Sequence, residues 1–64
     1  MREFQVRINN DTWKDIDISE TVIGDTIRCF DNNSRVVDHK GRKEWVVASS
    51  PFKNEQGILT INIY

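Results

Sequence analysis

Apolar and polar residues alternate along much of this chain, which is the pattern of strands that bury one face. Near the start, Phe4, Val6 and Ile8 fall on one side, and charged or amide residues fall on the other. Turn-forming residues follow at 9–11, and a second alternating run occupies 12–18. Because Asn and Asp favour tight turns, the pattern predicts an N-terminal β-hairpin.

Further strands are expected after the hairpin, each bounded by glycine, proline or a run of turn residues. Their predicted ranges are 26–30, 35–38, 43–49 and 58–64, with a hairpin turn at 38–41 and a loop at 51–57. The chain has eight isoleucines and six valines against one leucine and one alanine, and no segment shows a helical period. Since β-branched residues favour strands, the sequence predicts a single all-β domain, residues 1–64, with five or six short strands.

The alternation also predicts which side chains form the core. Six residues are expected to be buried together: Val6, Ile8, Ile27, Val47, Leu59 and Ile61. Cys29 is in phase with Ile27 and shares the preference of free cysteine for the interior. Trp45 shares a face with Val47, so it too is expected in the core. Phe4 and Phe30 are also expected to help close the core, although Phe30 falls out of phase with Ile27 and Cys29.

The second part of the chain contains a short segment that turns into a strand, Val22-Ile23-Gly24-Asp25-Thr26-Ile27-Arg28-Cys29-Phe30. The hairpin at 38–41 and Trp45-Val46-Val47 follow it. This order resembles that of small SH3-like barrels over residues 22–64. The resemblance implies a small SH3-like β-barrel, here preceded by the N-terminal hairpin. The small size and single domain are also similar to accessory proteins of bacteriophages or mobile elements.

Composition narrows the class of protein. The chain has 64 residues, 38% hydrophobic and 30% charged, with a net charge of −1. This is neither the composition of a disordered tail nor that of a membrane span. The single cysteine excludes an internal disulfide and, with one histidine, a thiolate zinc site. The first residues do not resemble a secretory signal, so a cytoplasmic location is expected.

We expect no enzyme and no cofactor. Acyl transfer requires a nucleophile, a base and an orienting group that converge, whereas the only histidine, His39, lies in a polar turn. The three glycines are isolated and precede no predicted helix, so they do not form a phosphate-binding loop.

A protein–protein interaction is the leading expectation, with this chain as a possible inhibitor or modulator of a host protein. The predicted partner-binding residues are Trp13, Asp15, Asp17 and Phe52. An exposed tryptophan is a common interface anchor, although Trp13 also fits a lid over one end of a barrel. Exposed sheet edges offer a second binding route.

Two alternatives stand beside it. Residues 35–53 carry a local charge of +3 and residues 1–20 a charge of −2. The basic hairpin fits nucleic-acid binding with Trp45 as a stacking group, but it also fits an ordinary solvated turn. Its candidate phosphate contacts are Arg35, Lys40, Arg42 and Lys43. The other alternative is a structural subunit that completes its core by homo-oligomerising.

Overall fold

A computed structural model describes residues 2–64, so Met1 of the predicted domain lies outside the described residues. It contains seven strands and one 3₁₀ turn. These are β1 (Arg2–Asn9), β2 (Thr12–Ile16), η1 (Ile18–Glu20), β3 (Thr26–Asp31), β4 (Ser34–Arg35), β5 (Trp45–Val46), β6 (Phe52–Lys53) and β7 (Leu59–Thr60). The all-β prediction is confirmed. No helical segment of residues 2–64 has the length and apolar character that crossing a bilayer requires.

The main sheet is antiparallel, with the order β2-β1-β3-β4, and β5 also pairs with β3. The predicted N-terminal hairpin is confirmed as β1 and β2. Phe4 is opposite Ile16 on one neighbour and Cys29 on the other, and Val6 is opposite Ile27. Because directly paired residues point to the same face, this register gathers the apolar side chains on one side of the sheet.

The turn predicted at 38–41 is present: Gly41 N–H donates to the Asp38 carbonyl, Asp38 N–H donates to the Arg42 carbonyl, and Gly41 has a φ of 84°. The strands on its two sides do not pair as a hairpin, because β4 and β5 do not pair with each other. Both pair with β3, β4 near its end and β5 near its start. The chain between them leaves the sheet and folds around the Asp38 carboxylate, which accepts the backbone N–H groups of Lys40 and Arg42. The local side chain thus takes donors that a strand ladder would have used, and both predicted strands are shorter than expected.

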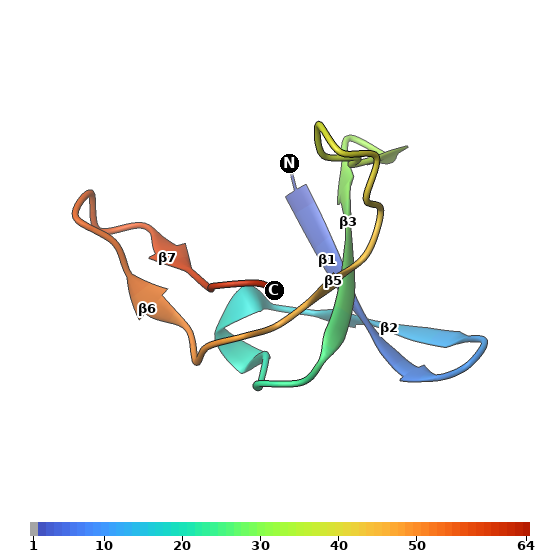
Figure 1. The fold of residues 1–64 in the computed structure, drawn as a ribbon, viewed down its shortest axis with the longest axis horizontal. Coiled ribbons are helices and arrows are strands. Elements are labelled where there is room, and N and C mark those ends of the chain that lie inside the picture. The colour runs from blue at the N-terminus through green and yellow to red at the C-terminus, as the bar shows by residue number, and fades with distance from the viewer. Residues whose placement is uncertain (1) are drawn as a thin grey trace.

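β6 and β7 form a separate two-stranded ribbon, β6–β7, outside the main sheet. An isolated bridge between Val47 and Ile63 joins it to the main sheet. Figure 1 shows the ribbon projecting on the side of the molecule opposite the β1–β2 turn. The strands therefore make an open sheet and a ribbon rather than a closed ring. β6 lies in the predicted loop at 51–57, because Asn54 closes a tight turn by accepting the backbone N–H groups of Gln56 and Ile58.

The core is small and lies on one face of the sheet. Its buried apolar residues are Val6, Ile27, Cys29 and Val47, and partly buried Phe4, Ile16, Trp45 and Ile61 pack against them. The prediction for Cys29 is confirmed, and Trp45, also expected in the core, is half-buried and packs against it. Leu59 and Ile61 are only half-buried. The burial of Ile8 was predicted wrongly: it is 58% exposed, because β1 continues beyond its last pair with β3.

Candidate functional site

The outer face of the main sheet, opposite the core, carries interleaved arginine and aromatic side chains. We call it the arginine–aromatic face; its members are Arg7, Trp13, Arg28, Phe30 and Arg35. Their placement follows from strand alternation, since Arg7 is paired with Trp13 and Phe30 with Arg35. Strands β1, β2, β3 and β4 each contribute to it.

The guanidinium groups of this face stack on its rings. The Arg28 guanidinium carbon lies 4.2 Å from the centroid of the Trp13 ring and 5.3 Å from that of Phe30. Arg7 lies 5.1 Å from the Trp13 centroid, and Arg35 lies 5.6 Å from the Phe30 centroid. All four distances fall within the range of cation–π attraction. The contacts join side chains from four strands into one layer and fix their orientation.

A polar network holds the same layer in place. Arg28 donates from Nε to Oε1 of Gln5 at 2.8 Å, and Gln5 donates from Nε2 to Asp15 at 3.0 Å. Glu44 pairs with two arginines, with Arg7 at 2.6 Å and with Arg35 at 3.6 Å. Within residues 2–64, Arg28 is thus the arginine of this face that has no carboxylate partner.

The four predicted partner-binding residues do not form one site. Trp13 and Asp15 both lie on the outer face, where Trp13 is half-buried between arginines rather than placed across a barrel end. Asp17 caps η1 by accepting the backbone N–H of Ser19, and this bond keeps the pKa of Asp17 below its ordinary value. Phe52 is on β6 of the projecting ribbon, whereas Trp13 and Asp15 are on β2, which lies on the other side of the molecule (Figure 1).

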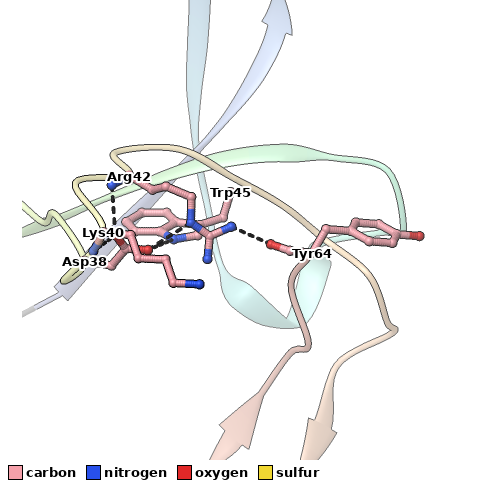
Figure 2. Close-up of polar contacts among 5 residues, drawn as sticks. All are labelled: Asp38, Lys40, Arg42, Trp45 and Tyr64. Atoms are coloured by element: carbon pink, nitrogen blue, oxygen red, sulfur yellow. Dashed lines mark hydrogen bonds and ion pairs between the residues drawn. The ribbon is translucent and has the colours of Figure 1, made fainter.

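Asp38 organises the loop between β4 and β5. Its carboxylate accepts the backbone N–H groups of Lys40 and Arg42, the Arg42 guanidinium and the Trp45 indole N–H. Figure 2 shows these bonds converging on one carboxyl group, with Arg42 also donating to the backbone oxygen of Tyr64. The Arg42 backbone N–H makes the largest contribution to holding the pKa of Asp38 at about 2. This loop is therefore built around a carboxylate that is charged at neutral pH.

Two of the four residues of the predicted basic site form ion pairs within the protein. Arg42 is paired with Asp38 at 3.0 Å, and Arg35 is paired with Glu44 on the outer face. Lys40 and Lys43 are exposed, and no ion pair of their side chains is seen in the described part of the chain. Arg35, Lys40, Arg42 and Lys43 thus divide between two surroundings and do not form one free basic patch.

A shallow depression of about 500 Å³ lies where the sheet meets η1. Asp15, Asp17 and Glu20 border it together with Arg2 and Phe4. Glu20 completes a capping box with Asp17, so two of these carboxylates already bond the backbone. The depression is an open surface with both charged and apolar side chains, and its polar groups do not point toward one common position.

Cys29 lies in the core and is 3% exposed. Burial raises the pKa of the Cys29 thiol above its ordinary value. A buried thiol with a raised pKa is a poor nucleophile, because the reactive form is the thiolate. Cys29 therefore serves packing.

Sequence reasoning missed Arg7 and Arg28 as members of the arginine–aromatic face, and Glu44 as the ion-pair partner of Arg7 and Arg35. Each lies on a predicted strand at a position out of phase with the apolar residues. The expectation that Phe30 helps close the core is wrong, because Phe30 lies on the outer face with Arg28 and Arg35. Its position out of phase with Ile27 and Cys29 was the signal for this.

Comparisons of the chain with protein-family models, with curated proteins and with solved structures found no match. Fold and site define the class: a small all-β protein with an open antiparallel sheet, a layered arginine–aromatic face on one side and an apolar core on the other. Within residues 2–64, no three His, Cys, Asp or Glu side chains gather closely enough to hold a metal ion.

Proposed function

We propose that this chain is a protein-binding module without chemistry of its own, and that the arginine–aromatic face is its binding surface. The observation that carries the proposal is the stacking of Arg28 on Trp13 at 4.2 Å, on an open sheet face. Tryptophan and arginine are the residue types that most often dominate protein interfaces. Here both are held in position before any partner arrives.

The preformed layer favours binding for an energetic reason. Ordering a long side chain at an interface costs about 0.5–1.5 kcal/mol. Arg7, Arg28 and Arg35 are already ordered by ring contacts and by Gln5 or Glu44. Much of this cost is therefore met in folding, and a partner gains more from each contact.

The charge pattern indicates the chemistry of the partner. Glu44 compensates Arg7 and Arg35, whereas Arg28 bonds the neutral amide of Gln5. A carboxylate from a partner would complete this arrangement, since guanidinium–carboxylate bonds are among the strongest hydrogen bonds in proteins. We therefore propose a protein partner that presents an aspartate or glutamate to Arg28 and an apolar or planar group to Trp13.

Selection from a displayed library of random peptides tests this proposal. The purified chain serves as bait, with Arg28→Ala and Trp13→Ala as test variants and Lys53→Ala, which removes an exposed cation on the β6–β7 ribbon, as the control. Selected peptides should be enriched in Asp or Glu. Their binding should weaken about 30-fold or more in each test variant, as for a central anchor, and should be unchanged in the control. Peptides without acidic residues that bind both variants as well as wild type would refute the proposal.

Nucleic-acid binding is the second candidate, and the observation that favours it is the exposure of Lys40 and Lys43 without ion pairs within residues 2–64. Such binding would be electrostatic, with a log–log salt slope of about −0.9 per neutralised phosphate on duplex or about −0.7 on single strands. Titration of single-stranded and duplex DNA at two salt concentrations separates the two classes. Salt-sensitive binding that is lost when Lys40 and Lys43 are replaced by serine would favour this candidate.

The relationship to SH3-like barrels is part of the same proposal. Its support is the turn at Val22–Asp25, where Asp25 N–H donates to the Val22 carbonyl and Gly24 adopts a φ of 96°. This turn directs the chain into β3, as the resemblance implies. We propose with it a cytoplasmic accessory protein of a bacteriophage or mobile element, acting as an inhibitor or modulator of a host protein.

A further inference from the structure

A surface distinct from the arginine–aromatic face lies on the other side of the sheet, where solvent reaches the edge of the core. A groove of about 470 Å³ separates the main sheet from the β6–β7 ribbon. Phe4, Ile27 and Cys29 line it from the sheet, and Leu59 and Ile61 line it from the end of the ribbon. The groove is thus a direct extension of the hydrophobic core.

Large apolar side chains at this groove are exposed to solvent. Ile58 is 60% exposed and Ile63 is 42% exposed, and both line the groove. Phe52, on the neighbouring strand of the ribbon, is 40% exposed. Exposed apolar side chains that share one groove, as Ile58 and Ile63 do, mark an interaction surface in soluble proteins.

The molecule exposes more surface to solvent than a compact monomer of its size. Its accessible surface is 4758 Å², whereas a compact monomer of 7.5 kDa exposes about 4,250 Å². Its Cα radius of gyration is 11.6 Å, against about 10.7 Å for a compact domain of this length. The excess of roughly 500 Å² approaches the area, about 600 Å² per partner, at the lower end of specific interfaces.

The ribbon that forms one wall of the groove is also the element that projects from the molecule (Figure 1). The chain after β7 is attached to residues 42–49 by the Val47–Ile63 bridge and by the bonds from Ala48 N–H to the Asn62 carbonyl and from Tyr64 N–H to the Val46 carbonyl. Asn62 N–H also donates to Ser49 Oγ, and Arg42 donates to the Tyr64 backbone oxygen. A projecting arm that exposes Phe52 and Ile58, beside an open apolar groove, can be self-complementary, since two-fold dimers use the same patch on both subunits. The net charge of −1 opposes such an approach only weakly.

We propose that a second copy of this chain covers the groove, with the β6–β7 ribbon of each copy lying in the groove of the other. Phe52 and Ile58 are the side chains that enter the partner copy. The two cores then join into one. This surface is separate from the arginine–aromatic face, so the dimer leaves Trp13 and Arg28 free to bind a different protein.

The test is sedimentation of the full chain across a wide concentration range. Wild type should be dimeric. Ile58→Asp should raise the dimer dissociation constant about 100-fold or more, because an unpaired carboxylate would have to enter an apolar groove. Val22→Asp is the matched control: Val22 is also 60% exposed but does not line the groove, so this variant should remain dimeric. Far-UV circular dichroism checks that both variants fold.

A wild-type chain that stays monomeric at all concentrations would overturn the dimer, as would an Ile58→Asp variant that dimerises like wild type. Equal dissociation of Ile58→Asp and Val22→Asp would also overturn it, because the effect would then be unspecific. Trp13→Ala should remain dimeric. The Trp13→Ala variant therefore tests the dimer independently of the proposed partner-binding function. Neither outcome for Ile58→Asp bears on that function.

Discussion

The Arg28 guanidinium lies 4.2 Å from the centroid of the Trp13 ring, although the two residues belong to strands separated by β1. This contact spans three strands and ties the edge strand β2 to the centre of the sheet. It also presents a tryptophan and an arginine, already oriented, on an uncovered face. The same contact therefore serves stability and, in our proposal, recognition.

A double-mutant cycle measures the stabilising part. Trp13→Ala, Arg28→Ala and the double variant should give a coupling of about 0.5–1 kcal/mol in the free energy of unfolding, as for a partly exposed cation–π pair. Trp13→Ala combined with Lys53→Ala, on the ribbon, is the control and should be additive within about 0.5 kcal/mol. Additive behaviour of Trp13 and Arg28 would show that the stacking contributes nothing to stability.

Adjacent valines on one strand segment test the position of the core. Val47 is fully buried and Val46 is 38% exposed. Val47→Ala should cost about 2 kcal/mol, from lost methyl burial and the cavity left behind, whereas Val46→Ala should cost about 1 kcal/mol or less. Denaturant titration gives both values, and equal costs would contradict the assigned core.

The Cys29 thiol provides a probe of core opening. Because it is 3% exposed and burial raises its pKa, a thiol reagent should label it slowly in the native state and rapidly in denaturant. Cys29→Ser should destabilise the protein by about 1–3 kcal/mol, since a buried hydroxyl needs a partner. Rapid native labelling would place the thiol at the surface.

Acid should weaken the fold partly through Asp38. A carboxyl group with a pKa lowered by folding contributes stability that is complete above its unfolded pKa, about 3.9, and is lost as pH falls through its folded pKa. For Asp38 the folded pKa is about 2. Thermal unfolding between these two values should show a shallower loss of stability in Asp38→Asn than in wild type. Identical slopes would mean that the Asp38 bonds do not form.

The local pattern of apolar and polar residues predicted the strands in which these residues alternate regularly. β1, β2 and β3 follow from period-two alternation, and the burial of Cys29 follows from its phase with Ile27. The 3₁₀ turn η1 was missed although its capping box, Asp17 to Glu20, is visible in the sequence. Its single turn is too short to produce a helical period.

The site depends on pairing between distant segments, which one sequence does not reveal. Trp13 was grouped with Asp15 and Asp17 because they alternate on one strand. The register of β1 against β3 instead places Arg28 beside Gln5, within reach of Trp13. The four basic residues were likewise grouped by their place in the chain, whereas in the structure Arg42 pairs with Asp38 and Arg35 pairs with Glu44. Local charge counts take no account of such internal pairs.

The most direct measurement of the central claim is the coupling between Arg28 and a partner carboxylate. A selected peptide and its Asp→Asn or Glu→Gln variant are titrated calorimetrically against wild type and Arg28→Ala, which completes a cycle across the interface. Our account predicts a coupling of at least about 1.5 kcal/mol, as for close charge pairs at interfaces. Coupling of less than about 0.5 kcal/mol, within the additivity of independent sites, would contradict the proposal that Arg28 receives the partner's carboxylate.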